Sequence, residues 1–479
     1  GFGFIGNIDE LTIQGSTSGT NPVPPTPSPS GGTSSGTGTS TGITGIALTP
    51  GTSGANGVMV DAEGVLRLQQ FVDPGGQLVR RRISEARVHL NPDAVKTSKL
   101  RKVSLNRLEA AVNRQIAEGQ PPTPEMQFLA GLTRVRFVFY YPDTKDIVLA
   151  GPAEGWAADA TGRMSGIESG RPTLQLQDLV VALRAFSPAK DKAPIILCSI
   201  DPTPEGLANM QSFLHSVGTQ INPEDTEMIV NGLRTNLGMQ NIRVGGVAPN
   251  THYAQVLLEC DYRMKLIGIG VEKPPVRMIS YVDRASPSHN RNALQRWFFI
   301  PDYHSVRLAA DRLGMELVGD GVKLVNEDQA VSKDGGRSAT GKINKASDMF
   351  TKSFTQKYPE LAARVPVFAE MRNMIDLAIV AAFVHKEDLY AKAGWKASTF
   401  NNERALKVET YQTPLQVETV CTAVWKGAQL FTPVGGGVTI RAQDALQTSN
   451  TLPDEDGKIS ELRETIQLDK LSPSRWWWD

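Results

Sequence analysis

The stretch that decides the fold is 366-PVFAEMRNMIDLAIVAAFVHKEDLYAKAGW-395. It begins with Pro366, and proline is favoured in the first turn of a helix. Its central part is apolar on nearly every side, which is typical of a helix with no face toward water. We therefore expect a long helix from Pro366 that other elements bury, in a chain of 479 residues that is long enough for roughly two to four domains.

The segments before this helix alternate strand and helix patterns. An apolar strand is predicted at 193–201, and two helices follow that begin with a capped proline and end at glycine. A further helix at 251–270 carries opposite charges four residues apart, Glu259 with Arg263 and Asp261 with Lys265. Together with strands expected at 241–247 and 277–283, this block predicts an α/β sandwich with helices on the sheet.

Hairpin patterns flank this sandwich on both sides. Reversals of the chain are expected at 61–64 and 142–145. Residues 296–328 are expected to form a three-strand meander that turns near Asp302 and near Arg312, with a third reversal or a bulge at 319–321. A helix beginning at Met349 is expected to be interrupted by Pro359. Further helices are expected at 104–119, 124–131 and 175–186, and the final strands at 415–442.

The fold class predicted from these patterns is α+β, or mixed α/β. It combines several hairpins with an α/β sandwich, a buried C-terminal helix and an extended N-terminal arm. The expected organisation is an arm at 1–55, an α+β unit at 56–190, an α/β unit with the meander at 191–330, a polar loop at 331–345, a helical and β unit at 346–470, and a Trp-rich tail at 471–479.

The arm is rich in Gly, Ser, Thr and Pro, and residues 11–60 carry no charged side chain. Such a segment cannot bury enough apolar surface to fold alone. We expect it to gain a fixed shape only by contact with another surface, such as a second copy of the chain. At the start of the arm, short strands are expected around Phe2 and Phe4, and they suit pairing with a sheet edge. The assembly contacts expected in the arm are Phe2, Phe4, Ile43, Ile46 and Leu48.

Motifs that would carry chemistry fail on inspection. Gly336–Lys342 has the spacing of a phosphate-binding loop, but polar residues precede it and Ile343 stands where a Mg²⁺-binding hydroxyl is required. We interpret it as a solvated loop that leads into a helix. The acidic turn at 454–457 resembles part of a calcium loop, but position twelve is Arg463, and we expect an Asp/Gly turn.

The histidines and cysteines form no ligand pattern. The six histidines are scattered, and the three cysteines (Cys198, Cys260 and Cys421) lie far apart in apolar runs, so buried free thiols are expected. His252 and Cys260 share a helix face but are separated by ~12 Å of helix rise, too far for a catalytic couple. We predict no catalytic residue, no cofactor and no metal, and the chain is not expected to be an enzyme.

Two further segments have a structural and a functional interpretation. Gly435–Gly437 could bring a backbone close to a ligand, but we prefer a hairpin turn or a bulge. Residues 80–102 carry nine basic groups when His89 is counted, which could meet an anionic polymer or lipid. A solvated face is the preferred interpretation, because this segment has no aromatic residues for base stacking.

The last residues include Trp476, Trp477 and Trp478. Each indole can bury ~200 Å² of surface, so this tail is expected to dock either in a groove of its own chain or on a neighbouring molecule. It completes the expected assembly contacts.

Five segments stand out within about residues 55–445: CSIDPTPEGLANMQ, VAPNTHYAQVLLECDYRMKLIGIGVEKPPV, WFFIPDYHSVRLAADRLGMELVGDGVKLV, TKSFTQKYPELAARVPVFAEMRNMIDLAIVAAF and WKGAQLFTPVGGGVTI. Together they resemble an uncharacterised family of secreted or envelope proteins typical of planctomycete bacteria. The resemblance implies export by a signal peptide, and the first residue, Gly1, fits a cleaved signal. It implies no reaction and no site residue, because the family has no known function.

The function expected from these observations is an exported cell-envelope component in the periplasm or on the outer surface. It would self-assemble as a ring, pore-like body or lattice, with other envelope proteins or a cell-wall polymer as further partners. Fifty basic residues balance fifty acidic ones, which argues against a nucleic-acid binder, and no run of 18 apolar residues predicts a transmembrane helix. The alternative is a periplasmic enzyme or small-ligand-binding protein with a pocket beside the helix at 366–391.

Overall fold

The structure is a computed structural model, and it describes residues 57–479 except 70, 191, 219–221, 287–292, 333, 426–428 and 432–433. The chain divides into two units, Gly1–Leu48 and Thr49–Asp479, and only the second is described below. The arm contacts expected at Phe2, Phe4, Ile43, Ile46 and Leu48 therefore lie outside the described residues.

The prediction of a mixed α/β fold is confirmed, with two large mixed sheets. The first sheet has nine strands in the order β1 (Val58–Val60), β2 (Val65–Leu68), β15 (Gln416–Glu418), β9 (Met239–Gly245), β8 (Ile196–Pro202), β18 (Val434–Ile440), β10 (Ala293–Pro301), β13 (Val322–Val331) and β14 (Arg337–Ala339). Strands from distant parts of the chain are neighbours, so this sheet is built by non-local pairing.

The second sheet has seven strands in the order β19 (Leu452–Pro453), β11 (Val306–Leu308), β12 (Gly314–Leu317), β4 (Phe137–Tyr141), β5 (Asp146–Ala153), β3 (Ser98–Ser104) and β20 (Trp477–Trp478). Two small hairpins accompany the sheets, β6 (Trp156–Ala158) with β7 (Met164–Gly166) and β16 (Ala423–Trp425) with β17 (Gln429–Phe431). The C-terminal strand β20 closes one edge of the seven-stranded sheet against β3.

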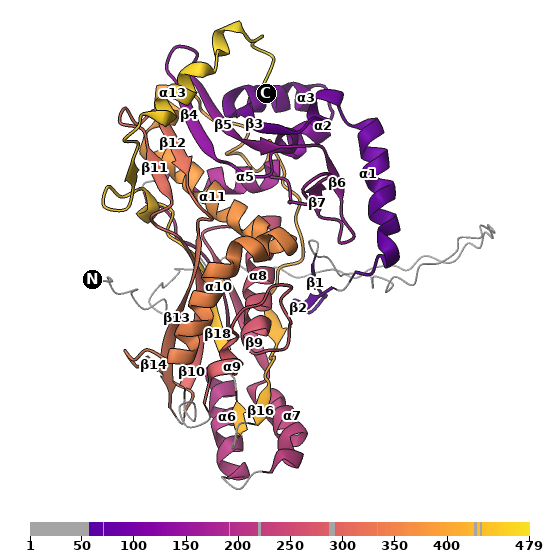
Figure 1. Ribbon diagram of the computed structural model, residues 1–479, viewed down its shortest axis with the longest axis vertical. Coiled ribbons are helices and arrows are strands. Elements are labelled where there is room, and N and C mark those ends of the chain that lie inside the picture. The colour runs from indigo at the N-terminus through magenta and orange to yellow at the C-terminus, as the bar shows by residue number, and fades with distance from the viewer. Residues whose placement is uncertain are drawn as a thin grey trace, which may run out of the picture. The chain divides into compact units, whose positions relative to one another are not determined.

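Thirteen α-helices in the described part of the chain pack on and between these sheets (Figure 1). They are α1 (Gln77–His89), α2 (Pro92–Val95), α3 (Leu105–Ala117), α4 (Pro124–Gln127), α5 (Leu176–Ala185), α6 (Pro204–Val217), α7 (Thr226–Leu237), α8 (His252–Gly268), α9 (Tyr281–Arg284), α10 (Lys345–Arg364), α11 (Pro366–Lys386), α12 (Leu389–Lys392) and α13 (Lys458–Thr465). Helix α8 packs on β8 and β18, and α10 packs on β13, so both cover the nine-stranded sheet.

The predicted central helix is confirmed as α11. It begins at Pro366, and every residue from Val367 to Val384 is buried. Helices α5, α8 and α10 pack against it, and its Asn373 donates a hydrogen bond of 3.1 Å to the carbonyl of Thr133, just before β4. The apolar surface on all sides of α11 explains why it holds these elements together. The helix ends at Lys386 and not at 391.

Many local predictions are also confirmed. Ser104 caps α3 by accepting from the backbone N–H of Arg107, and Thr203 and Thr251 cap α6 and α8 in the same way. The hairpins β1–β2 and β4–β5 reverse where their turn residues predict. These features depend on residues close in sequence, which a sequence pattern reports well.

Other predictions were wrong. Residues 296–328 form no single meander, because β10 and β13 pair in the nine-stranded sheet while β11 and β12 pair in the other. The segment 277–283 forms no strand; instead Ser280 and Asp283 make a capping box that begins the short helix α9. Pro359 does not interrupt α10, which continues to Arg364 with Tyr358 and Leu361 buried.

In the part of the chain that the structure describes, no helix combines the length and the apolar character that crossing a membrane requires.

Candidate functional site

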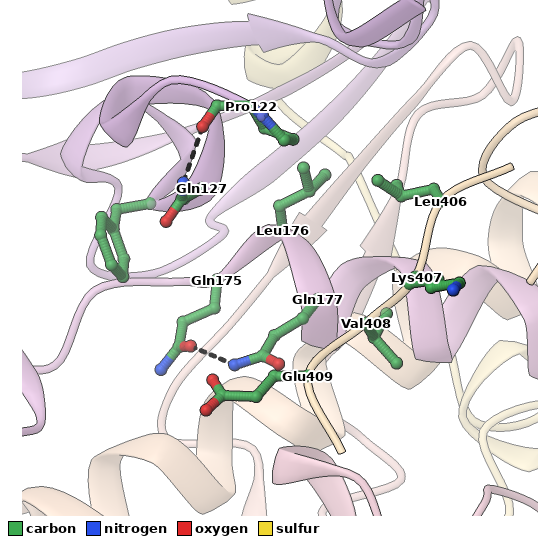
Figure 2. Close-up of a pocket in the computed structure, with 10 residues that line it drawn as sticks. Pro122, Gln127, Gln175, Leu176, Gln177, Leu406, Lys407, Val408 and Glu409 are labelled. Carbon is green, nitrogen blue, oxygen red and sulfur yellow. Dashed lines mark hydrogen bonds between the residues drawn. The ribbon is translucent and has the colours of Figure 1, made fainter. Parts of the chain in front are cut away.

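A pocket of about 260 Å³ lies where the loop before α4, the first turn of α5 and the segment 406–409 meet (Figure 2). Its polar lining groups belong to Gln127, Gln175, Gln177, Lys407 and Glu409, and its apolar ones to Pro122, Phe128, Leu176, Leu406 and Val408. None of these residues comes from α11, although the alternative function predicted from the sequence expected a pocket beside that helix. The pocket is the candidate functional site.

Three of the polar residues, Gln175, Gln177 and Glu409, lie together and form what we call the polar wall, while Gln127 lies apart beside Pro122 (Figure 2). Gln177 donates a hydrogen bond of 2.7 Å to the side-chain oxygen of Gln175. Figure 2 shows the Glu409 carboxylate turned toward these two glutamines, while the Lys407 amine points away from them. The hydroxyl of Tyr411 is hydrogen-bonded to Glu409 and Gln177, and burial followed by the Glu409 charge raises the pKa of Tyr411. The wall therefore offers one carboxylate and two amides, and Tyr411, which does not line the pocket, is bonded to that carboxylate.

Asp178 follows Gln177 in α5 and anchors the first turn of this helix. It is buried, and both of its carboxylate oxygens accept a hydrogen bond from Nδ1 of His252, at 3.0 and 2.9 Å. His252 is the first residue of α8, so the contact joins the starts of two helices. A backbone bridge between Thr251 and Thr410 ties the loop of Glu409 to the same point.

The Asp178–His252 pair extends into a buried charge network. Nε2 of His252 lies 3.9 Å from the carboxylate of Glu370 on α11. Arg163 donates to Glu370 at 2.6 Å and to Glu259 at 3.0 Å. Burial alone would favour a neutral imidazole, but the charges of Asp178 and Glu370 outweigh it and raise the pKa of His252 to about 9. Burial also raises the pKa of Glu370.

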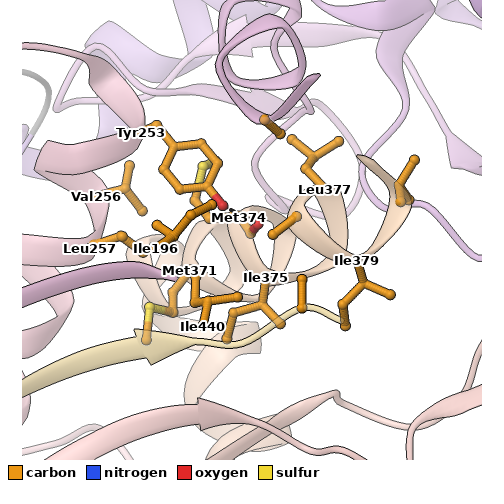
Figure 3. Packing of buried hydrophobic residues seen from close by; sticks show 14 of the residues in the cluster. Ile196, Tyr253, Val256, Leu257, Met371, Met374, Ile375, Leu377, Ile379 and Ile440 are labelled. Atoms are coloured by element: carbon orange, nitrogen blue, oxygen red, sulfur yellow. Dashed lines mark hydrogen bonds between the residues drawn. The ribbon is translucent and has the colours of Figure 1, made fainter. Parts of the chain in front are cut away.

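This network rests on the apolar core around α11 (Figure 3). The hydroxyl of Tyr253, one residue after His252, donates a hydrogen bond of 2.5 Å to the carbonyl of Met374. Ile196 of β8 and Ile440 of β18 pack in the same cluster, so the nine-stranded sheet, α8 and α11 meet here. The charged residues are enclosed, and their contacts link α5, α8 and α11.

His252 and Cys260, which we did not expect to form a catalytic couple, have different partners in the structure. His252 pairs with Asp178, and the Cys260 thiol instead contacts the carbonyl of Val367 at 3.2 Å. All three cysteines are free and buried, as expected. The i,i+4 pairs on α8 are confirmed at 3.7 Å for Glu259–Arg263 and 2.7 Å for Asp261–Lys265. Within the described residues no cluster of His, Cys, Asp and Glu has the arrangement of a metal site.

Sequence reasoning missed the partners of His252 and the glutamines of the pocket. A signal for the network was present, since Glu370, Arg372 and Asp376 interrupt an otherwise apolar helix. Each is buried, and Asp376 pairs with Arg134 at 3.0 Å. A charge in a helix without a solvated face needs a buried partner. No such signal marked Gln175 or Gln177, because glutamine is common at surfaces.

The remaining motifs have the following outcomes. Lys342 is exposed in the loop between β14 and α10, as predicted. Asp454 accepts from the backbone N–H of Ile459 in an Asp/Gly turn. Gly435–Gly437 form no hairpin turn: they lie inside β18, between β8 and β10. Neighbouring backbones leave no room for a side chain at Gly436 and Gly437, and the Asp201 carboxylate fills the space at Gly435. In the basic segment α1 has no buried residue, but Arg101 is completely buried.

The tryptophan tail docks on its own chain. Trp477 and Trp478 pair with Val103 and Lys102 of β3, and the side chains of Trp476 and Trp478 are buried. The Arg101 guanidinium lies 4.9 Å from the centre of the Trp477 ring and binds both carboxylate oxygens of Asp479. Of the two docking modes expected from the sequence, the tail adopts the intramolecular one, and contacts with a second copy stay a prediction.

Comparison with known proteins finds a match for one part of this chain. No curated protein and no solved structure matches the chain. One family model does match, and it covers the segment from β8 through α8 to the start of α9, which includes His252 and Glu259. Residues 198–281 thus form a domain described as protein of unknown function (DUF1598).

Proposed function

We propose that this protein is an exported, non-enzymatic component of the cell envelope that self-associates through its two chain ends. One observation carries the proposal: each large sheet ends in a strand with a single described neighbour, next to one end of the chain. Strand β1 follows the arm directly and pairs only with β2, and β20 lies at the C-terminus and pairs only with β3.

An edge strand presents unpaired backbone N–H and C=O groups, which an extended segment of another molecule can pair with. The arm supplies such a segment, because it carries short strand patterns around Phe2 and Phe4 and enters the fold at β1. An arm that pairs with the edge of the next copy makes a head-to-tail contact, which generates a ring or an open lattice. Export to the periplasm or outer surface belongs to the same proposal, and it is supported by the sequence resemblance alone.

Mass photometry tests this proposal on three proteins: the full chain, a variant without residues 1–55, and a variant that keeps the arm but replaces Phe2, Phe4, Ile43, Ile46 and Leu48 by Ser. We expect oligomers of the full chain, and monomers of both variants if the apolar residues carry the contact. Monomers in all three samples across the accessible concentration range would refute self-association. Oligomers in all three would assign the contact to the globular unit and overturn the role of the arm.

A second candidate function is the binding of a small ligand, and the pocket at Gln175, Gln177 and Glu409 favours it. This function needs no assembly, so the two proposals are independent of each other.

A further inference from the structure

We propose that the pocket binds one ring of a neutral saccharide, either a free sugar or the end of a polymer. This inference rests on the second candidate function above and names its ligand class. It follows from three properties of the pocket: the hydrogen-bonding groups of its polar wall, the apolar groups in the rest of its lining, and its size.

The polar wall has hydrogen-bonding capacity that the protein does not use. The side-chain amide nitrogen of Gln175 has no acceptor among the described residues, although Gln175 is only 8% exposed. The nitrogen itself is reached by solvent, and a ligand oxygen can accept from it in place of water. The side chain is held in place, because its own oxygen accepts from Gln177. The wall therefore holds one amide donor that a ligand acceptor can reach.

Glu409 supplies the opposite capacity. An ionised carboxylate only accepts hydrogen bonds, and no cation of the described residues forms an ion pair with Glu409. Because Lys407 points away (Figure 2), the polar wall carries a negative charge beside amide donors. An anionic ligand is disfavoured there. Adjacent hydroxyl groups fit, since each hydroxyl both donates to a carboxylate and accepts from an amide.

Apolar groups complete the pocket. The ring of Phe128 lines it and is supported by Trp156, with the ring centres 6.0 Å apart. Pro122, Leu176 and Val408 add further apolar surface. A sugar ring has hydroxyl groups around its edge and C–H groups on its faces, so it matches a pocket that is polar on one wall and apolar on others. The volume of about 260 Å³ is below the ~300–1,000 Å³ of sites for drug-sized ligands, which suits a single ring.

The site is also rigid enough to select a ligand. Asp178 holds the first turn of α5 through His252, and Gln127 donates a hydrogen bond of 2.6 Å to the carbonyl of Pro122. A wall that does not rearrange on binding loses less conformational entropy, which favours the weak contacts of a sugar hydroxyl.

Ligand-observed saturation-transfer NMR on the full chain tests the inference, because it detects weak binding to a protein of this size. The probes are glucose, N-acetylglucosamine and their β-linked dimers, with alanine and dialanine as non-sugar probes. We expect saturation transfer to at least one sugar and none to the non-sugar probes. Glu409→Gln should weaken sugar binding ~10-fold, because it replaces a charged acceptor by a neutral amide. Gln175→Ala should weaken it at least as much.

Glu455→Gln is the matched control, since Glu455 is exposed and does not line the pocket. It should bind as the wild type does. Glu409 is exposed, so its variant is expected to fold even if Gln175→Ala does not. Transfer only to the non-sugar probes would overturn the saccharide class and retain a ligand-binding function. No transfer to any probe would overturn both. Sugar binding that neither pocket variant weakens would overturn the assignment to this pocket.

Discussion

Gly437 lies at the centre of the nine-stranded sheet, where two backbones pass on either side of β18. A Cβ atom built on Gly437 would lie 1.9 Å from the carbonyl oxygen of Cys198, and one on Gly436 would lie 2.0 Å from that of Trp297. Neither neighbour can move without breaking the strand pairing, because both contacts are with backbone atoms. Lys265 of α8 also contacts these strands: its amine donates to the carbonyls of Ile200 and Gly436 at 2.8 and 3.2 Å.

We predict that Gly437→Ala lowers the free energy of unfolding by more than ~3 kcal/mol, since a methyl group there overpacks a fixed backbone. The control is Gly245→Ala in β9, where the new Cβ would be 3.4 Å from a side-chain carbon of Leu197, an ordinary contact. It should change the free energy by less than ~1 kcal/mol. Urea denaturation followed by circular dichroism measures both, and equal effects of the two variants would contradict the packing argument.

At the scale of elements, the two-residue strand β20 has more contacts than its length suggests. The carbonyl of Trp476 accepts from the N–H of Ser104 at 2.9 Å, and Trp478 packs with Phe139 and Val148 in a separate apolar cluster. Among the described residues, Asp479 is the only carboxylate bound to the completely buried Arg101. Strand β20 therefore covers the edge of β3, and Asp479, directly after it, neutralises the buried charge of Arg101.

Deleting residues 476–479 should expose β3 and leave Arg101 without a carboxylate. We expect amide hydrogens of the peptide spanning 98–104 to exchange more than ~10-fold faster, because their β20 partners are lost. Hydrogen–deuterium exchange by mass spectrometry measures this directly. Residues 204–217 of α6 serve as the internal reference and should be unaffected. Unchanged exchange at 98–104 would mean that β20 contributes nothing to the stability of the sheet edge.

The sequence predicts most helices and hairpins of this fold but not the membership of its sheets. Ser104 and Thr203 mark helix starts because their hydroxyls act on backbone groups only three residues away. No local residue shows which sheet β11 and β12 join, because their neighbours β19 and β4 come from distant segments of the chain. Pro359 shows the opposite case: a local helix breaker is overruled, because Phe354 and Tyr358 pack in one aromatic cluster with Phe299 and Phe368.

For the whole molecule, the buried charges connect helices that cover different parts of the fold. Asp178 belongs to α5, His252 and Glu259 to α8, and Glu370 to α11, which also contacts the segment before β4. Breaking one partner of such a network leaves an uncompensated buried charge, which typically costs ~3–5 kcal/mol. Only the charges within α11 could be anticipated from the sequence, because their partners lie far away along the chain.

The protonated state of His252 should make the stability of the whole fold depend on pH. Its pKa is about 9 in the folded protein and near 6.5 when unfolded, so the folded state binds the proton more tightly. The stabilisation is fully present below about pH 6.5 and is lost as the pH rises through about 9, in total on the order of 3 kcal/mol. Urea denaturation between pH 6 and 10 should show this decline in the wild type and in the control His89→Gln, whose side chain is exposed on α1. His252→Gln should be less stable at pH 6 and nearly independent of pH between 6 and 8. Above pH 8 both proteins share a further decline, because burial raises the pKa of the Cys198, Cys260 and Cys421 thiols. A decline in His252→Gln equal to that of the wild type would show that another group is responsible.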